Sequence, residues 1–310
     1  MKLIPLFPQA RIADRETRRR RLDALLPLLL MFCSSSVVLA QAPSDPPLAA
    51  GTREVTDRYL ELTFNQQYDA LLDLYTEDAV FFDPTGDVFK PDQPHEPTVG
   101  GARIVALQKS WGIESTDFDI DAAFTVGEYS LYRGTLNTRF RGSDRTIAIP
   151  LVMVLRVVNG RIAQRMDIGE YIESFGLGNR FDAATAETRT VADRYLRAYL
   201  DADLDAQRNE LDASVRFQDQ TAQLFGPPSG QLIEGADTLL KRRAITFANI
   251  SDFNLDVSDS FVSWHHAVYI GTTTYTVGSG ASYAQPAVFV IEVRDGKVTR
   301  HWDFVDYTVR

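Results

Sequence analysis

After residue 52, apolar side chains recur first at helical spacing and then in long strand-forming stretches. Val55, Tyr59 and Leu62 share one face of a predicted first helix. The short run from Ala79 to Phe82 is aliphatic and aromatic, which predicts a strand. In order, the pattern predicts helices near 55–62, 70–74 and 102–111, and strands near 79–82, 117–126, 129–140, 145–158 and 161–171.

The same order of predicted elements returns in the second half of the chain. The pair Asn159-Gly160 separates the last two predicted strands of the first half, and Asp295-Gly296 occupies the same place in the second half. Such pairs are typical of tight hairpin turns. The second half has predicted helices at 190–200, 204–211 and after Gly235, and predicted strands near 214–219, 252–260, 263–276, 283–294 and 297–307.

The two halves match at a constant distance along the chain. Twenty-four residues separate Tyr59 from Asp83, and the same number separates Tyr195 from Asp219. An offset of 136 residues relates Tyr59 to Tyr195, Asp83 to Asp219, Pro150 to Pro286, Asp167 to Asp303 and Tyr171 to Tyr307. This agreement indicates a tandem duplication of one domain.

Each half is long enough to form a domain of its own. We therefore predict domains over residues 52–175 and 187–310, joined by a linker at 176–186. Helices followed by strands indicate an α+β fold. We expect two tandem cone-shaped domains, in each of which three helices pack on a curved, mostly antiparallel sheet.

The N-terminus has the features of a secretory signal peptide. Arg18 to Arg21 precede an apolar run that ends at Val38-Leu39-Ala40, which has the small-residue pattern of a cleavage site. We expect residues 1–40 to be removed, residues 41–51 to form a flexible leader, and the protein to be periplasmic or secreted. The alternative is an uncleaved anchor, but the run is shorter than the roughly 20 apolar residues of a membrane span.

Removal of residues 1–40 changes the charge and the cysteine content. The segment holds seven of the 32 basic and three of the 42 acidic residues, so the net charge changes from −10 to about −14. This acidity argues against nucleic acid as a partner, because such binding depends on Lys and Arg contacts. The single cysteine, Cys33, is also lost, which excludes disulfides and thiol catalysis from the remaining chain.

Several short motifs in both halves resemble the SnoaL-like, or nuclear transport factor 2-like, superfamily. The first half carries Arg58-Tyr59 with the stretch from Ala79 to Pro84. The second half carries Arg194-Tyr195, the stretch from Val215 to Asp219, and the closing stretch from His301 to Asp306. The resemblance implies a cone fold with an internal cavity. Members include ketosteroid isomerases, polyketide cyclases, scytalone dehydratase and limonene epoxide hydrolase.

Comparison with the isomerases implies roles for the repeated tyrosine and aspartate. Tyr59 and Tyr195 correspond to the tyrosine that stabilises an oxyanion, and Asp83 and Asp219 to the aspartate that moves a proton. A further acid of these isomerases, on the next-to-last strand, aligns with Val152 and Val288, so half of the oxyanion site is missing. The epoxide hydrolases have an inward aspartate on the last strand, which aligns with Asp167 and Asp303.

Alternation along the last strand of each half places further polar groups on the same face. Arg165 and Asp167 point the same way, and so do His301 and Asp303. Two carboxyl groups in an apolar cavity would form an acid and base pair. Candidate catalytic residues are Tyr59, Asp83, Asp167, Tyr195, Asp219 and Asp303; candidate ligand contacts are Arg165, His301, Trp111 and Trp302. No metal site is expected, because no His partner spacing supports one.

Structural roles remain open for the same residues. Arg165 and Asp167 could form a plain ion pair, Asp83-Pro84 could start a turn, and Tyr59 and Tyr195 could be core tyrosines bonded to the backbone. Two hypotheses follow. The protein encloses a small apolar molecule and carries out cofactor-free isomerisation, cyclisation, dehydration or hydrolysis. Alternatively, it is a non-catalytic ligand-binding or interaction module that associates through the outer faces of its sheets.

Overall fold

A computed structural model describes residues 46–92, 96–226 and 229–309. The predicted signal peptide lies outside these residues. Helix α1 begins at Pro46, so residues 46–51 of the predicted leader are helical. Among the described residues, none of the helices is long and apolar enough to cross a membrane.

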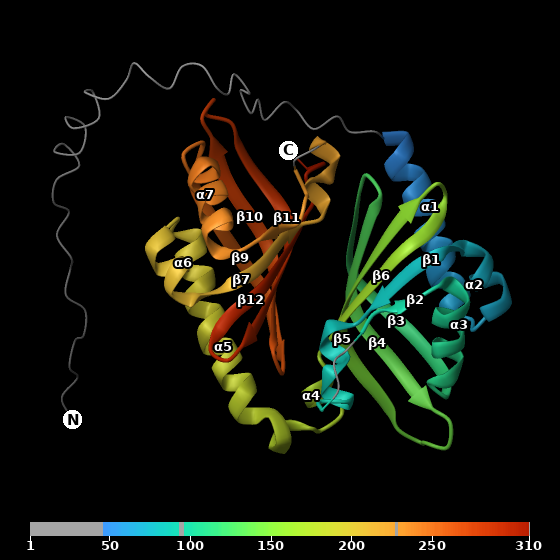
Figure 1. Cartoon of the computed structure of the whole chain (residues 1–310). Helices are drawn as coiled ribbons and strands as arrows, with labels where there is room; N and C mark the ends of the chain where they lie inside the picture. The colour runs from blue at the N-terminus through green and yellow to red at the C-terminus, as the bar shows by residue number, and fades with distance from the viewer. Residues whose placement is uncertain (1–45, 93–95, 227–228, 310) are drawn as a thin grey trace, which may run out of the picture. The chain divides into compact units, whose positions relative to one another are not determined.

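Domain 1 consists of a six-stranded sheet with three helices on one of its faces (Figure 1). The strand order is β2-β1-β6-β5-β4-β3, in which only β1 and β6 pair in parallel. The elements are α1 (Pro46–Phe64), α2 (Tyr68–Leu74), β1 (Tyr75–Phe82), the 3₁₀ helix η2 (Pro84–Phe89), β2 (Thr98–Val99), α3 (Gly101–Ser110), β3 (Ile113–Val126), β4 (Tyr129–Phe140), β5 (Thr146–Val158), β6 (Arg161–Gly169) and α4 (Tyr171–Ser174).

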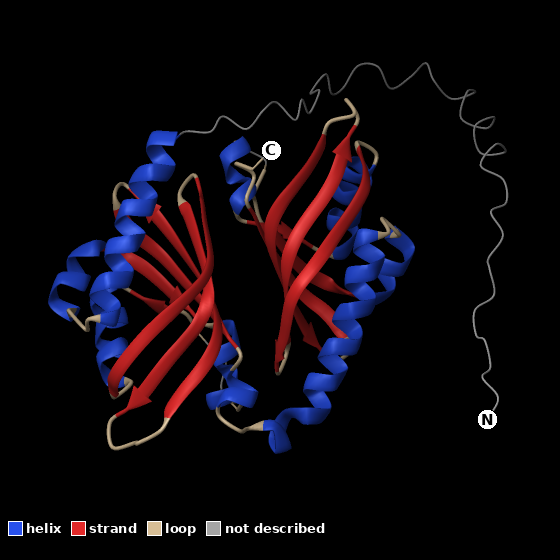
Figure 2. Ribbon diagram, turned by 180° about the vertical axis from the view of Figure 1, so that it is seen from behind, coloured by secondary structure: helices blue, strands red, loops and turns tan. Residues whose placement is uncertain are grey.

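Domain 2 repeats this arrangement, with the strand order β8-β7-β12-β11-β10-β9 (Figure 2). Its elements are α5 (Gly178–Leu200), α6 (Leu204–Glu210), β7 (Leu211–Asp219), the 3₁₀ helix η3 (Thr221–Phe225), β8 (Ile233–Glu234), α7 (Ala236–Phe247), β9 (Ile250–Ser263), β10 (His266–Val277), β11 (Ser282–Arg294) and β12 (Lys297–Val305). The predicted α+β class and the tandem repeat are confirmed.

Glycines at matching places mark irregularities in the two sheets. A Cβ atom on Gly134 would lie 1.9 Å from the carbonyl oxygen of Asp119, and one on Gly271 would lie 2.0 Å from that of Asp256. The strand register shifts beside both glycines. A bulge bends a strand and increases its twist, so these positions help to curve each sheet around its helices.

Strand β5 buries both of its faces over residues 151–155. On β5, Leu151 and Met153 pack with Tyr59 of α1 inside domain 1. Val152 and Val154 point the other way and join a cluster that also contains Val288 and other residues of the domain 2 sheet. Burial of each such aliphatic side chain contributes about 1.5–3 kcal/mol. Part of the outer face of each sheet is therefore buried in the core of the tandem protein.

The connection between the domains differs from the predicted linker. Helix α5 begins at Gly178 and includes most of residues 176–186. Phe181 in its first turns is only 4% exposed and packs with Tyr171 and Ile172 of domain 1. The first turns of α5 are therefore helical and packed against domain 1.

Candidate functional site

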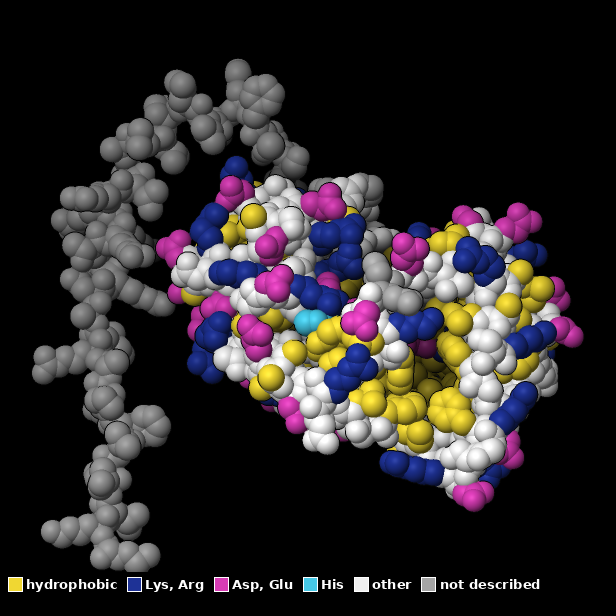
Figure 3. Space-filling view, turned by 60° about the horizontal axis from the view of Figure 1, so that its bottom comes forward, with side chains coloured by type: hydrophobic (Ala, Val, Ile, Leu, Met, Phe, Trp, Pro, Cys, Tyr) yellow, Lys and Arg dark blue, Asp and Glu magenta, His cyan; other side chains and the backbone are white. Residues whose placement is uncertain are grey.

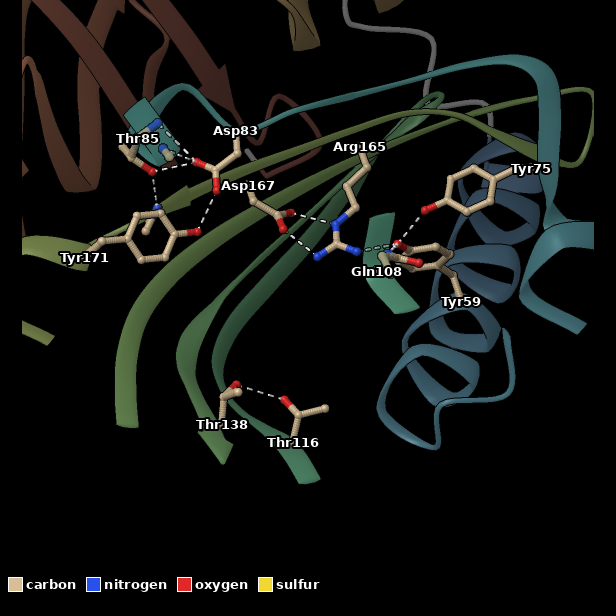
Figure 4. Close-up of polar contacts among 12 residues, drawn as sticks. Tyr59, Tyr75, Asp83, Thr85, Gln108, Thr116, Thr138, Arg165, Asp167 and Tyr171 are labelled. Atoms are coloured by element: carbon tan, nitrogen blue, oxygen red, sulfur yellow. Dashed lines mark hydrogen bonds and ion pairs between the residues drawn. The ribbon is translucent and has the colours of Figure 1, made fainter. Parts of the chain in front are cut away.

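A buried polar network crosses the interior of domain 1 between α1 and β6 (Figure 4). Arg165 donates from Nε to Asp167 Oδ1 at 2.8 Å, and its Nη2 donates to the other carboxylate oxygen. Nη1 of the same guanidinium donates to Tyr59 Oη at 2.7 Å. Arg165 and Asp167 share a face of β6, as predicted, and both are buried. Arg165 therefore binds the carboxylate of Asp167 in bidentate geometry.

The Tyr59 hydroxyl has further partners. It lies 2.7 Å from Tyr75 Oη, and Gln108 on α3 donates to it from Nε2 at 3.1 Å. With Arg165, three side chains engage this oxygen, and Tyr59 has no exposed surface. A hydroxyl in this position organises the interior of the domain and is not presented to a ligand.

Asp83 lies apart from this network, at the end of β1. Its Oδ1 accepts bonds from Thr85 N, Thr85 Oγ1 and Gly86 N, and so caps the first turn of η2. Its Oδ2 accepts a single bond, from Tyr171 Oη at 2.7 Å. Thr85 in turn accepts from the backbone of Gly169 at the end of β6. Asp83 remains partly exposed, whereas Asp167 is buried.

The surroundings of Asp83 favour its protonated form. Burial of most of the side chain, followed by repulsion from Asp167, raises the pKa of Asp83 to about 7. The bonds from Tyr171, Thr85 and Gly86 act in the opposite direction but are outweighed. Burial also raises the pKa of Tyr171 well above its usual value, so its hydroxyl stays neutral and remains a donor. A carboxyl group with such a pKa can accept or release a proton near neutral pH.

Domain 2 builds its buried network from different residues. His301 stands where domain 1 has Arg165, and its Nδ1 lies 2.9 Å from Tyr195 Oη. The positive charge comes instead from Arg243 on α7, which donates to Tyr195 Oη at 2.7 Å. Arg243 also donates to Gln207 Oε1 at 2.7 Å. The tyrosine of the first helix therefore has a guanidinium partner in both domains.

Asp303 completes the network of domain 2. His301 Nε2 lies 2.6 Å from Asp303 Oδ1, and Tyr199 Oη donates to Oδ2 at 3.3 Å. Burial lowers the pKa of His301, against the attraction of Asp303, and the charge of Arg243 lowers it further. A neutral His301 suits an environment that already contains the Arg243 charge.

Asp219 lies at the end of β7 and keeps the arrangement of Asp83. We call these two residues the rim aspartates. Asp219 Oδ1 accepts from Thr221 Oγ1 at 3.1 Å and from Ala222 N at 3.0 Å, while Tyr307 Oη donates to Oδ2. Thr221 accepts from the backbone of Val305, as Thr85 does from Gly169. Burial and then repulsion from Asp303 raise the pKa of Asp219 to about 7. Asp219 is also partly exposed.

The sequence patterns did not identify several residues of the site. Tyr171 and Tyr307 appeared only as markers of the repeat, although their hydroxyls bind the rim aspartates. Their shared offset was the signal that could have identified them. Gln108 and Arg243, the buried polar residues of the third helices, had no such signal, because their types differ between the halves.

The two candidate tryptophans lie on opposite faces of their sheets. Trp111 packs beside Phe81, with its ring centroid 5.9 Å from the Arg165 guanidinium carbon, on the inner side of domain 1. Trp302 lies on the outer face and packs with Phe304 and residues of the other sheet. It therefore does not share an interior with His301.

The expected alignment of Val152 and Val288 with an inward acid needs correction. Both valines point to the outer face. In register, Met153 lies opposite Asp167 and Phe289 lies opposite Asp303, so these residues hold the inward positions. They carry no carboxyl group either, and the isomerase pattern stays incomplete on this strand.

Aromatic side chains gather near the rim aspartate of domain 1. Phe89 at the end of η2 is 49% exposed, and its ring centroid lies 5.2 Å from that of Tyr171 and 5.1 Å from that of Phe175. Figure 3 shows a hollow bordered by hydrophobic side chains in the right half of the view, which holds domain 1. Tyr171, which bonds to Asp83, is part of this aromatic cluster, and apolar surroundings near a titratable carboxyl group suit a small apolar ligand.

The described residues contain no group of three or more His, Cys, Asp or Glu side chains arranged to hold a metal ion.

Several solved structures are similar to part of this chain. A protein of Shewanella putrefaciens CN-32, provisionally named a SnoaL-like polyketide cyclase, is 20% identical, with 40% of this chain and 93% of that chain covered and a TM-score of 0.35. An M. tuberculosis LEH-like epoxide hydrolase is 15% identical, with coverage of 41% and 89% and a TM-score of 0.35.

A third similar structure contains a bound small molecule. A Catenulispora acidiphila DSM 44928 protein with a ketosteroid isomerase-like fold, in complex with trimethylamine, is 17% identical, with coverage of 37% and 83% and a TM-score of 0.32. No curated protein matches the chain.

The sequence profile of the SnoaL-like domain matches this chain twice, at residues 56–165 and 192–301. The matched segments cover most of both sheets and hold the rim aspartates of both domains. The chain therefore belongs to the SnoaL-like domain family, of which it contains two tandem copies.

Proposed function

We propose that the protein encloses a small apolar molecule in one or both domains and transfers a proton on it without a cofactor. The observation that supports this proposal is the pair of rim aspartates, Asp83 and Asp219. Each is partly exposed, has a pKa raised to about 7, and lies near a buried aspartate of the last strand. Proton transfer of this kind would serve an isomerisation, cyclisation, dehydration or hydrolysis.

The bonding of Asp83 suggests which of its oxygens reacts. Oδ1 already accepts three bonds, whereas Oδ2 accepts only that of Tyr171. Oδ2 thus has a free lone pair that can take a proton from a ligand. Until the proton is transferred, the hydrogen bond from Tyr171 stabilises the negative charge of the Asp83 carboxylate. Asp219 shows a similar division, because its Oδ1 accepts two bonds and its Oδ2 accepts only that of Tyr307.

The buried aspartates act on the rim aspartates at a distance. Asp167 and Asp303 raise the pKa of Asp83 and Asp219 by repulsion. Their direct partners are Arg165 in one domain and His301 with Tyr199 in the other. We assign them the role of tuning groups. A general base is most effective when its pKa is close to the working pH.

A non-catalytic ligand-binding protein is the second candidate. The three partners of the Tyr59 hydroxyl favour it, because a saturated donor does not stabilise an oxyanion. In this case the cones hold a ligand, and the rim aspartates serve only as caps of η2 and η3.

Substitution of the rim aspartates tests both candidates. The wild-type protein, Asp83→Asn, Asp219→Asn and the double variant are screened by thermal shift and product formation with steroid-, polyketide- and terpenoid-like compounds. Asp78→Asn, on the exposed side of β1, is the matched control. We expect turnover to fall at least about 100-fold in the double variant, as for loss of a general base, with the control unchanged.

The outcomes separate the two candidates. A compound that stabilises every variant equally and is never converted supports the binding protein. Equal turnover by the wild type and the double variant would contradict proton transfer by the rim aspartates.

We also propose that the protein is exported, with cleavage after Ala40. The basic cluster, the apolar run and the small residues that end it support this proposal. N-terminal sequencing of the protein from periplasmic and culture fractions should give Gln41 as the first residue. An intact N-terminus in those fractions would contradict cleavage.

A further inference from the structure

A row of charged side chains crosses the outer face of the domain 2 sheet. Arg300 on β12 lies in register with Arg216 on β7, and Arg216 lies in register with Glu234 on β8. The matching row of domain 1 contains Gln164, Val80 and Val99. The fold therefore does not require charge at these positions, and the two arginines are a feature of domain 2 alone.

Two neighbouring arginines in a sheet repel each other and need a counter-charge. Arg216 has one, because its Nε lies 3.1 Å from Glu234 Oε1. Arg300 forms no ion pair with any described residue, and its guanidinium carbon lies 4.9 Å from the Trp302 ring centroid. Burial, followed by repulsion from Arg216, lowers the pKa of Arg300, against the attraction of Glu292, which lies opposite it in register on β11, and of Glu234. A half-buried guanidinium without an acceptor is suited to bind an anion.

Both arginines border a cavity of about 950 Å³ between the outer faces of the two sheets. Trp302 of domain 2 and Met166 and Phe82 of domain 1 give it apolar walls. Gln220, also in the wall, is 4% exposed, and its Oε1 has no hydrogen-bond partner among the described residues. The cavity thus combines a cation, apolar surface and a free buried acceptor.

The other arginines of this cavity are already compensated. Arg294 is paired with both Asp87 and Glu292, and Arg156 with Glu128. The nearby acidic groups make a dianion such as phosphate costly here. One unpaired arginine matches one negative charge, and the volume lies within the range of small-molecule sites.

We propose that this cavity is a second ligand site, which binds a small organic monocarboxylate with an apolar body. The carboxylate lies against Arg300 and Arg216, the body packs against Trp302 and Met166, and a hydroxyl or N–H group of the ligand donates to Gln220. This site is separate from the cone interiors and independent of the proton transfer proposed for them.

Titration with 2-naphthoate and its neutral analogue 2-naphthalenemethanol tests the proposal on the full protein. Binding is measured by calorimetry and by tryptophan fluorescence. We expect 2-naphthoate to bind, and Arg300→Gln to weaken it about 10-fold or more, as for loss of a charge-assisted hydrogen bond. Arg161→Gln, which removes an exposed arginine of β6, is the charge-matched control and should bind as the wild type does.

Two further measurements locate the ligand. Trp302→Phe should weaken the fluorescence response while calorimetric binding persists, with the remaining response coming from Trp264, which also lines the cavity. Asp83→Asn with Asp219→Asn should leave 2-naphthoate binding unchanged. The proposal is overturned if 2-naphthoate does not bind, if Arg300→Gln and Arg161→Gln bind it equally, or if the neutral analogue loses as much affinity in Arg300→Gln as 2-naphthoate does.

Discussion

The interiors of the two domains use the same charges but take them from different elements. In domain 1, the guanidinium beneath the first-helix tyrosine is Arg165 of β6, and the helix facing it contributes Gln108. In domain 2, the strand contributes the neutral His301 and the helix contributes Arg243. The comparison shows that each interior requires one cation near the first-helix tyrosine and the last-strand aspartate. Either the last strand or the third helix can supply this cation.

The rim aspartates show the opposite behaviour. In both domains the rim aspartate accepts bonds from a threonine two residues later, from a backbone N–H three residues later and from a tyrosine at the end of the domain. The buried networks around the first-helix tyrosines have therefore diverged between the domains, while the surroundings of the rim aspartates have stayed similar. This contrast is why we assign the chemistry to the rim and a supporting role to the buried network.

The largest effect is expected from removal of the domain 1 cation. Arg165→Met leaves Asp167 buried without its charged partner, which costs about 3–5 kcal/mol of unfolding free energy. His301→Gln in domain 2 should cost only about 1–3 kcal/mol, because Arg243 remains. Urea unfolding followed by circular dichroism measures both. Equal losses would contradict the assignment of Arg243 as the cation of domain 2.

A transplant of the domain 2 arrangement into domain 1 sharpens the comparison. Arg165→His alone should be destabilising, and addition of Gln108→Arg should restore stability, with a coupling energy of about 1–3 kcal/mol. Gln108→Arg alone serves as the control and should be destabilising, since it places two guanidinium groups beside Tyr59. Strictly additive losses in the double-mutant cycle would show that the two positions do not exchange roles.

A smaller effect is expected in the dependence of stability on pH. Because the folded pKa of Asp83 and Asp219 is raised to about 7, the native state holds protons that the unfolded state releases near pH 4. Stability should therefore fall as the pH rises from about 4 to 7, by on the order of 1–2 kcal/mol for each aspartate after allowance for solvent.

The double variant Asp83→Asn with Asp219→Asn should lose much of this slope, and Asp78→Asn should keep it. Urea unfolding at a series of pH values measures the difference. Identical slopes for wild type and double variant would mean that other groups account for the pH dependence.

Much of the fold follows from local patterns in the sequence. Helix and strand periods, together with the hairpins at Asn159-Gly160 and Asp295-Gly296, predicted the order of elements, because both signals act over a few residues. Both turn pairs adopt the positive φ angles that such hairpins require. Helix α5 was the exception, since the contacts of Phe181 with domain 1 decide where it begins.

The site could be predicted only in part. Alternation along the last strand placed Arg165 with Asp167, and His301 with Asp303, on a shared face. The direction of Val152 depends on the register between β5 and β6, which a single sequence does not specify. Arg243 and Tyr195 are 48 residues apart in the chain, so only the tertiary packing of the domain brings them together.

The central claim is that Asp83 and Asp219 titrate near neutral pH, and carboxyl ¹³C NMR of protein labelled at aspartate measures this directly. Asp83→Asn and Asp219→Asn assign the two signals. The account predicts that both titrate with a pKa of about 7, well above the other aspartates. Values at or below about 4, as in unperturbed aspartates, would contradict it.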